Sequence, residues 1–285
     1  MKTIQLILII PFVIFFVSCE DSAPGDYEEN YIVEALLLVD KPIKGISIIK
    51  TQPIFDVYVH DSAMVRNANV IIEGDGRSFN LQFKNREDGE VGYFYDDTSY
   101  LIKENTQYKI KITLPNGKLI SGETTTPGKT EWVKRAKDFL QFPLDTLKLP
   151  STDTVIWKKV PMIDFYLIGV TSLDTLEYGS YLNPSTEEMN RRIERPWRQD
   201  RFFREISSIS PIANTQSTIV WNTFRWFGKH EVVVYAPDWN FLRWYIQSQA
   251  RQELDPLLSS ITGAYGFVGS ASIISDTSFV LKNQP

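Results

Sequence analysis

Residues 107–118, Gln-Tyr-Lys-Ile-Lys-Ile-Thr-Leu-Pro-Asn-Gly-Lys, decide the fold. Every second residue from Tyr108 to Leu114 is apolar and the residues between them are polar, which is the pattern of a strand with one buried and one solvated face. Asn116-Gly117 then predicts a hairpin turn, because both residues tolerate the positive φ that tight hairpins require. The stretch therefore predicts two antiparallel strands with one face against a core.

Similar short apolar runs, separated by turns such as Gly74-Asp75-Gly76, extend in both directions from this hairpin. The spacing of the turns predicts a β-sandwich of immunoglobulin or transthyretin type over residues 31–128. Its predicted strands are Tyr31–Val39, Gly45–Thr51, Asn69–Glu73, Arg77–Phe83, Val91–Tyr95, Gln107–Leu114 and Lys118–Thr125.

Residues 129–285 predict a second β-rich domain with one or two short helices, so the fold class is mainly β. Ser185 and Glu188 have the spacing of a helix-capping box, and residues 237–254 carry apolar residues at helical spacing. Gly228 predicts a hairpin between the predicted strands Ser217–Arg225 and Lys229–Ala236. The predicted strands are Pro161–Thr171, Ser217–Arg225, Lys229–Ala236, Ala264–Ala271 and Ser272–Leu281.

Residues 1–18 have the pattern of a lipoprotein signal peptide. Lys2 precedes a run without charge, too short to span a membrane comfortably, that ends in Ser18-Cys19. The pattern resembles a bacterial lipobox, although Phe16 stands where leucine is usual. Cys19 is the single cysteine of the chain, which excludes an internal disulfide and predicts that Cys19 accepts the lipid. The alternative is an ordinary signal peptide followed by an unrelated cysteine.

Residues 19–30 form an acidic stretch with Pro24 and Gly25, which predicts a flexible tether with a reach of about 15–20 Å. Glu20 and Asp21 also resemble the export tag of surface-displayed lipoproteins, and the reading as a plain solvated tether is equally open. The net charge of −5 argues against general nucleic-acid binding.

No pattern in the sequence predicts a catalytic residue, a metal ligand or a cofactor. The chain has two histidines, His60 and His230, and neither has a second histidine or cysteine at metal-ligand spacing. His230 is expected to be half-buried in a strand. The segment Gly263–Gly269 lacks the residues of a phosphate-binding loop and predicts a bent or bulged strand where another backbone comes close.

The arginine-rich segment, residues 191–204, is a candidate binding surface. It sets six arginines against two acidic residues, which gives a local charge of +4 in an acidic protein. Because arginine and aromatic side chains are enriched at interface hot spots, the hypothesis is that Arg195, Trp197, Arg198 and Arg201 contact an acidic loop of a partner protein or an anionic envelope component. The alternative is a solvated face with internal ion pairs.

A second group of aromatic residues is expected to lie mainly in the core, with one or two exposed exceptions. The open alternative is that exposed members stack on sugar rings or anchor a partner. The residues are Trp221, Phe224, Trp226, Phe227, Trp239, Phe241, Trp244 and Tyr245.

Several short motifs follow one another along the chain in an order that resembles a family of Bacteroidota outer-membrane lipoproteins, the DUF4249 group. They are the lipobox-like Cys19, Tyr31-Ile-Val-Glu34, Val65-Arg-Asn-Ala-Asn-Val70, Gly92-Tyr-Phe94, Tyr108-Lys-Ile110, Thr124-Thr-Thr-Pro127, Trp244-Tyr245 and the segment from Gly263 to Ser270. The resemblance implies an immunoglobulin-like domain followed by a β-rich domain, a position at the outer membrane facing either the periplasm or the cell exterior, and a TonB-dependent transporter as the partner. The expected function is a non-enzymatic accessory of such a transporter. A surface adhesin or glycan-binding module is the alternative, and an enzyme is the third possibility.

Overall fold

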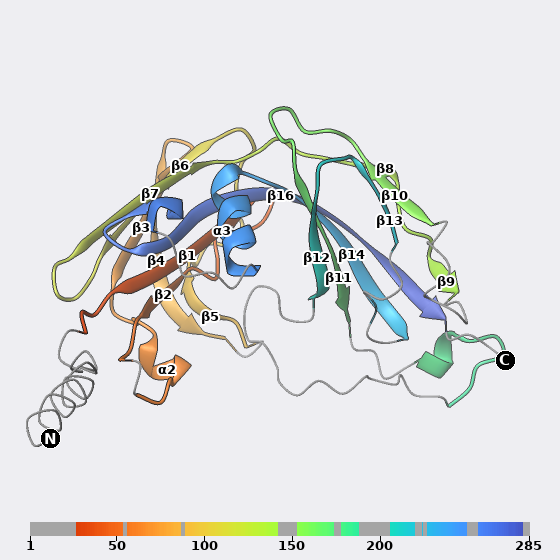
Figure 1. The fold of residues 1–285 in the computed structure, drawn as a ribbon, viewed down its shortest axis with the longest axis horizontal. Helices are drawn as coiled ribbons and strands as arrows, with labels where there is room; N and C mark the ends of the chain where they lie inside the picture. Colours follow the sequence, from red (N-terminus) through yellow and green to blue (C-terminus); the bar gives the residue numbers. More distant parts are fainter. Residues whose placement is uncertain are drawn as a thin grey trace, which may run out of the picture.

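The computed structural model describes residues 27–53, 56–86, 89–141, 153–173, 178–187, 206–219, 224, 227–249 and 256–281. These residues form three sheets and a few short helices (Figure 1). The mainly β fold class is therefore confirmed, including the N-terminal sandwich, the β-rich second part and the short helices.

The largest sheet has seven strands. Along it lie β12 (Ile206–Ile212), β11 (Tyr166–Ser172), β14 (Gly228–Pro237), β16 (Tyr265–Leu281), β1 (Tyr31–Leu38) and β2 (Ser47–Lys50), and β9 (Phe139–Gln141) pairs with the far end of β16.

The second sheet has six strands: β15 (Ile261–Thr262), β7 (Leu119–Thr125), β6 (Gln107–Thr113), β3 (Asn69–Gly74), β4 (Arg77–Asn85) and β5 (Val91–Phe94). The third has β13 (Gln216–Thr218), β10 (Thr154–Trp157) and β8 (Trp132–Lys134). The helices are α2 (His60–Ala63), α3 (Trp239–Gln249) and the 3-10 turns η1 (Tyr178–Tyr181) and η3 (Pro256–Leu258).

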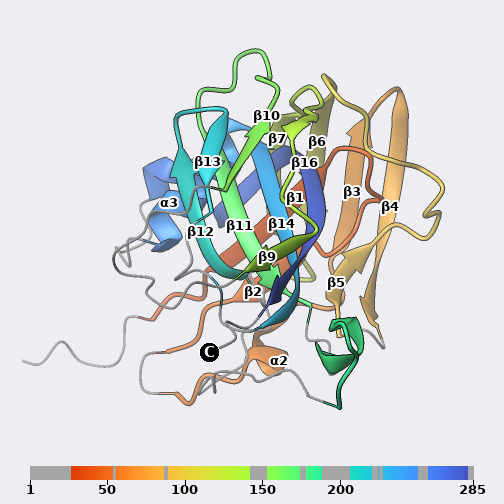
Figure 2. The same cartoon turned by 90° about the vertical axis from the view of Figure 1, so that its right-hand side faces the viewer.

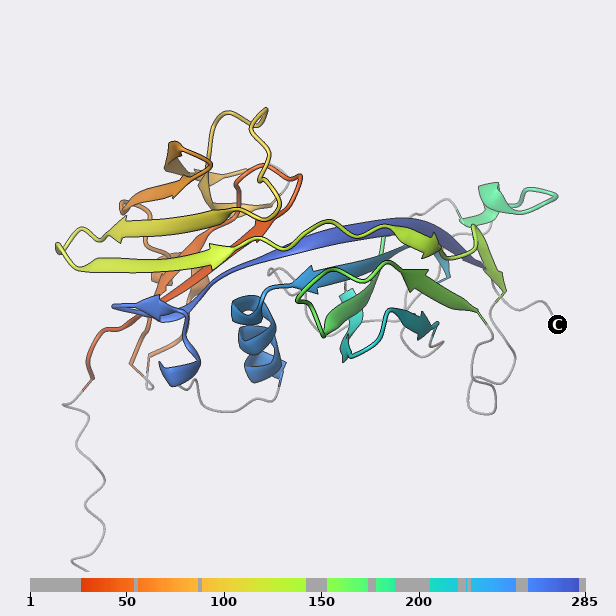
Figure 3. The same ribbon diagram turned by 90° about the horizontal axis from the view of Figure 1, so that it is seen from above.

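Strand β16 connects the two halves of the molecule. Its 17 residues extend over about 55 Å at the usual rise of a strand. Its first part pairs in parallel with β1, and its later part pairs antiparallel with β14 and in parallel with β9 (Figure 3). The N-terminal and C-terminal halves of the chain therefore share one continuous sheet.

The N-terminal sandwich consists of the six-stranded sheet packed against the β1–β2 end of the large sheet. Alternate residues of β1, such as Val33 and Ala35, enter the same buried cluster as Ile110 and Ile112 of β6. This is the face that the alternation between Tyr108 and Leu114 predicts, and the polar residues between them are exposed. Removing apolar surface from water stabilises a fold by roughly 25 cal/mol per Å². Burial of this cluster is therefore the main stabilising contribution to the N-terminal half.

The two faces of β16 pack against different layers. On one face, Val268 enters the N-terminal core and Val280 enters a second cluster with the three-stranded sheet. On the other face, Phe267 and Ala271 pack against α3. Helix α3 and strands β3 and β4 thus lie on opposite sides of the large sheet (Figure 2).

Two glycines of β16 permit close packing, as the sequence predicts for Gly263–Gly269. Gly266 has φ +117°, and a Cβ there would lie 1.9 Å from the Val33 carbonyl oxygen of β1. A Cβ on Gly269 would lie 2.8 Å from the backbone nitrogen of Phe241 in α3. The close approach of other backbones is therefore confirmed at both positions.

Asp238 joins three layers of the fold at the start of α3. Its Oδ1 accepts a hydrogen bond from the Phe241 backbone N–H at 2.8 Å, which caps the helix. Its Oδ2 accepts one from the Thr124 hydroxyl of β7 at 2.5 Å, and Thr124 Oγ1 lies 2.8 Å from Ser270 Oγ of β16. Burial raises the pKa of Asp238, and the bonds from Thr124 and Phe241 oppose that rise.

Two predictions about the C-terminal half need correction, and two have no test. Ala264–Ala271 and Ser272–Leu281 are one strand, because β16 has partners along its whole length. The predicted hairpin around Gly228 is wrong, since β13 pairs with β10 and β14 pairs with β11 and β16. The helix expected from Ser185 to just before Pro196 falls mainly on residues 188–195, outside the described residues, and the boundary between 128 and 129 stays a prediction.

Candidate functional site at the N-terminal end

The residues that the sequence selects as sites lie outside the part of the chain that the structure describes. This holds for Cys19 and for Arg195, Trp197, Arg198 and Arg201, so their lipidation and partner-binding roles stay predictions.

The two histidines have different environments. His60 is exposed, and its Nδ1 lies 3.0 Å from the Tyr58 hydroxyl. His230 is fully buried rather than half-buried, with Nδ1 2.9 Å from the Gly228 carbonyl oxygen and its ring edge-on to Phe224. Burial lowers the pKa of His230 to about 4, so its ring is neutral near pH 7. Among the described residues, no group of three or more His, Cys, Asp or Glu side chains could hold a metal ion.

The aromatic segment packs largely as expected where the structure describes it. Phe224, Phe241, Trp244 and Tyr245 are buried, while Trp239 at the start of α3 is 62% exposed. Trp221 and Trp226 lie outside the described residues.

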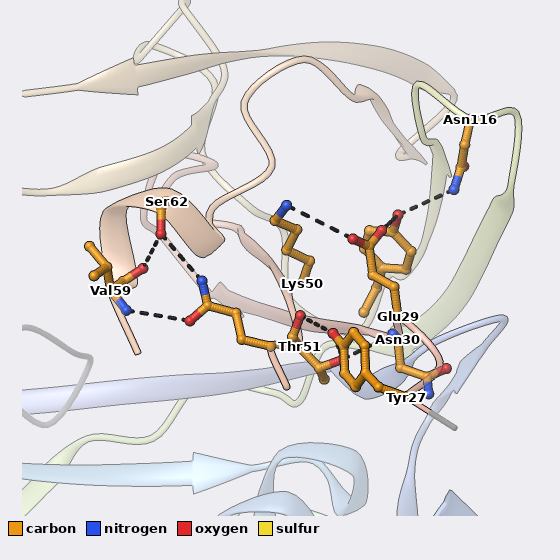
Figure 4. A network of polar contacts seen from close by, with 10 residues as sticks. Tyr27, Glu29, Asn30, Lys50, Thr51, Val59, Ser62 and Asn116 are labelled. Atoms are coloured by element: carbon orange, nitrogen blue, oxygen red, sulfur yellow. Dashed lines mark hydrogen bonds and ion pairs between the residues drawn. The ribbon is translucent and has the colours of Figure 1, made fainter. Parts of the chain in front are cut away.

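The remaining candidate surface lies where the described chain begins (Figure 4). We call it the N-terminal end, and it comprises residues 27–31, residues 50–52, Asn116 and the loop 56–59. The Tyr27 hydroxyl donates to the Thr51 carbonyl oxygen and lies 2.9 Å from Thr51 Oγ1. The Asn30 backbone N–H donates to Thr51 Oγ1 at 3.0 Å, and the Thr51 N–H donates to the Asn30 carbonyl at 2.8 Å. These contacts continue the β1–β2 pairing beyond the strands and fix residues 27–30 to the fold.

A charged cluster lies on the same end. The Tyr31 hydroxyl donates to Glu29 Oε1 at 2.5 Å and accepts from Asn116 Nδ2 at 3.2 Å. Lys50 Nζ lies 3.9 Å from Glu29 Oε2. The hydrogen bond to Glu29, together with burial, raises the pKa of Tyr31. The β6–β7 turn therefore contacts the first residue of β1 through Asn116.

The loop 56–59 is linked to the same end of the molecule through Gln52. Val57, Tyr58 and Val59 are 85%, 52% and 50% exposed. The Val59 backbone N–H donates to Gln52 Oε1 at 3.4 Å, and Gln52 Nε2 donates to Ser62 Oγ at 3.3 Å. Gln52 follows Thr51 in the chain, so the loop and the N-terminal segment share one network of contacts.

Sequence reasoning missed this loop, although a signal for it exists. The run from Ile54 to Val59 is mostly apolar but follows Pro53, and it belongs to none of the predicted strands, so its apolar side chains have no predicted partner. Chemically, the N-terminal end offers an apolar projection and a charged cluster, which is suited to contact with a surface.

No described helix has the length and apolar character needed to cross a membrane. No curated protein matches this chain. A solved structure of a 1.5-MDa bacterial ice-binding adhesin is matched over 89% of this chain at 8% identity and a TM-score of 0.21, and the chain spans 64% of that structure's chain. A TM-score this low carries no argument about the fold.

The family described as "Domain of unknown function (DUF4249)" matches residues 20–276. That range covers the sandwich, α3 and most of β16. Because the match extends over nearly the whole chain after the predicted signal peptide, this chain belongs to the DUF4249 family.

Proposed function

We propose that this chain is an outer-membrane lipoprotein, anchored through Cys19, that serves as a non-enzymatic binding partner of a TonB-dependent transporter. The observation that carries the anchoring is the attachment of Tyr27 to Thr51 at one end of the molecule. Cys19 precedes Tyr27 by eight residues, which reach at most about 29 Å when extended. A lipid on Cys19 would therefore hold the N-terminal end close to the bilayer.

This geometry leaves the C-terminal half free to meet a neighbour. The described chain begins beside β1 and β2, while β9 and the three-stranded sheet lie at the opposite end of β16 (Figure 1). The support for a transporter as the partner comes from the family resemblance and from the arginine and aromatic composition of residues 191–204.

Replacing Cys19 by Ala tests the anchoring. The variant should lack the acyl mass at the mature N-terminus and leave the detergent phase, because several buried acyl chains at about 0.8 kcal/mol per methylene supply the membrane affinity. Ser22→Ala, in the same segment, is the control and should stay lipidated. A wild-type N-terminus at another residue, without acyl mass, would contradict the anchoring.

Replacing Arg198 and Arg201 by Ala tests the partner. Co-purification of a TonB-dependent transporter from outer-membrane extracts should fall, and added salt should lower it in the wild type. The charge-matched control is Lys109→Ala with Lys111→Ala, because both lysines are more than half exposed on the N-terminal sheet. Equal recovery from both variants at every salt concentration would leave the arginines as a solvated face, and a large fall in Tm would assign them a structural role.

A further inference from the structure

Three consecutive apolar side chains are exposed in the loop 56–59. Val57, Tyr58 and Val59 are each at least half exposed. In a strand packed on a core, successive side chains point to opposite faces and every second one is buried. Here side chains in both directions stay at least half exposed, so the fold presents an apolar projection to its surroundings.

Described residues on both sides of the loop make hydrogen bonds to it. On one side, the Asp56 backbone N–H donates to the Pro53 carbonyl at 3.1 Å, and Gln52 bonds to Val59. On the other side, Ala63 is fully buried and its N–H donates to the Val59 carbonyl at 3.1 Å. The next residues join the sheet, since the Val65 N–H donates to the Ile48 carbonyl at 2.9 Å.

The loop is also close to the point where the chain leaves the fold toward Cys19. Tyr27 is bonded to Thr51, and the following residue, Gln52, is bonded to Val59 (Figure 4). The eight residues from Cys19 to Tyr27 span at most about 29 Å when fully extended. A bilayer that holds a lipid on Cys19 would therefore be within reach of this loop.

We propose that Val57, Tyr58 and Val59 insert into the headgroup and acyl boundary of the phospholipid bilayer that carries the lipid anchor. This inference rests on the proposed anchoring at Cys19. Valine side chains favour the acyl boundary, and a tyrosine has an apolar ring with a hydroxyl that suits the headgroup level. The insertion would fix the orientation of the whole sheet relative to the membrane, which a flexible tether alone does not do.

Apolar insertion, and not attraction between charges, drives this contact. The loop is flanked by Asp56 and by Asp61, and the latter pairs with Arg66. Acidic neighbours give no attraction to anionic lipids, so the contact should be insensitive to salt.

The test places a fluorescent probe in the loop of the lipidated full chain. Cys19 is the single cysteine and is consumed by the lipid, so Val57→Cys adds one reactive thiol for a nitrobenzoxadiazole label. Val133→Cys is the matched control, because Val133 is 62% exposed on β8 in the C-terminal half. Both proteins are reconstituted in vesicles of phosphatidylethanolamine with a minority of phosphatidylglycerol, after a melt shows that both are folded.

Quenching by doxyl-labelled lipid should be at least about threefold stronger at position 57 than at position 133, and quenching by aqueous iodide correspondingly weaker, with no loss in added salt. Equal quenching at both positions, in protein that floats with the vesicles and carries the acyl mass, would overturn the insertion and leave the anchoring intact. Protection from iodide without quenching by doxyl lipid would also overturn it, because the occupant is then a second copy of the chain. Protein that lacks the acyl mass and does not float would overturn the anchoring itself, and the insertion with it.

Discussion

Gly266→Ala should be strongly destabilising, although alanine is the smallest side chain that can replace glycine. In Gly266→Ala, the added Cβ would lie 1.9 Å from the Val33 carbonyl oxygen and 2.8 Å from the Val33 backbone carbon and nitrogen. These are backbone atoms of a paired strand, so no side-chain rotation can relieve the contact. Strands β1 and β16 would have to separate locally.

Two contributions set the magnitude. An L-residue at φ +117° costs about 1–3 kcal/mol of backbone strain. Separating the strands weakens two or more ladder hydrogen bonds, each of which contributes about 0.5–1.5 kcal/mol. The free energy of unfolding should therefore fall by about 3–5 kcal/mol.

The control isolates the steric contribution. Gly117 has φ +83°, and a Cβ there would meet nothing within 4 Å. Gly117→Ala should therefore cost only the backbone strain, about 1 kcal/mol or slightly more. The difference between the two variants measures the contact between Gly266 and Val33.

Urea and thermal unfolding of the chain from Glu20 onwards, followed by tryptophan fluorescence, provides the measurement. At about 2–4 °C per kcal/mol for a chain of this size, a loss of about 3–5 kcal/mol should lower the Tm of Gly266→Ala by roughly 6–20 °C. Equal melting of the Gly266 and Gly117 variants would refute the close parallel pairing of β1 with β16.

Three further predictions concern pH and domain structure. Burial lowers the pKa of His230 from 6.5 to about 4, so the folded state binds fewer protons than the unfolded state between these values. Stability should therefore fall by up to about 3 kcal/mol as pH drops from 6.5 to 4, and urea unfolding of His230→Gln should lack this dependence. Burial raises the pKa of Asp238 above 3.8, so its contribution to stability is present below that pH and is lost as pH rises through the folded pKa. Asp238→Asn should gain stability relative to the wild type between pH 3.5 and pH 7, and a constant difference would contradict the buried carboxyl. Residues 27–128 alone should give a β-type circular dichroism spectrum and a cooperative melt, at a lower temperature than the whole chain because β1 loses its pairing with β16. A helical or featureless spectrum would contradict the separate sandwich.

The N-terminal strands and turns could be predicted from the sequence because their signals are local. Alternation between Tyr108 and Leu114 marks the buried face of β6, and Asn116-Gly117 marks the turn that follows. All seven strands predicted between Tyr31 and Thr125 are present within a few residues of their predicted ends. Helix α3 was also predictable, since residues such as Leu242 and Tyr245 recur at helical spacing and are buried.

The candidate site could be predicted only in part. The lipidation of Cys19 rests on the order of residue types near the N-terminus and stays a prediction. The exposure of Val57, Tyr58 and Val59 could not be predicted, because an apolar run in a sequence usually indicates a buried strand. In the structure, Gln52 and Ala63 make hydrogen bonds to the loop from its two sides.

The sequence by itself determined the N-terminal strands and their turns, the presence of helix α3 and the order of motifs that resembles the family, because neighbouring residues carry those signals. It did not determine the whole buried face of α3, since Ile246 of the predicted face is 44% exposed. Only the tertiary structure decided that β16 is one strand, that it pairs in parallel with β1, and that its side chains contribute to two hydrophobic cores. The physical reason is distance along the chain. More than 200 residues separate Val33 from Gly266, and no local pattern specifies which backbone will approach a glycine that has no Cβ.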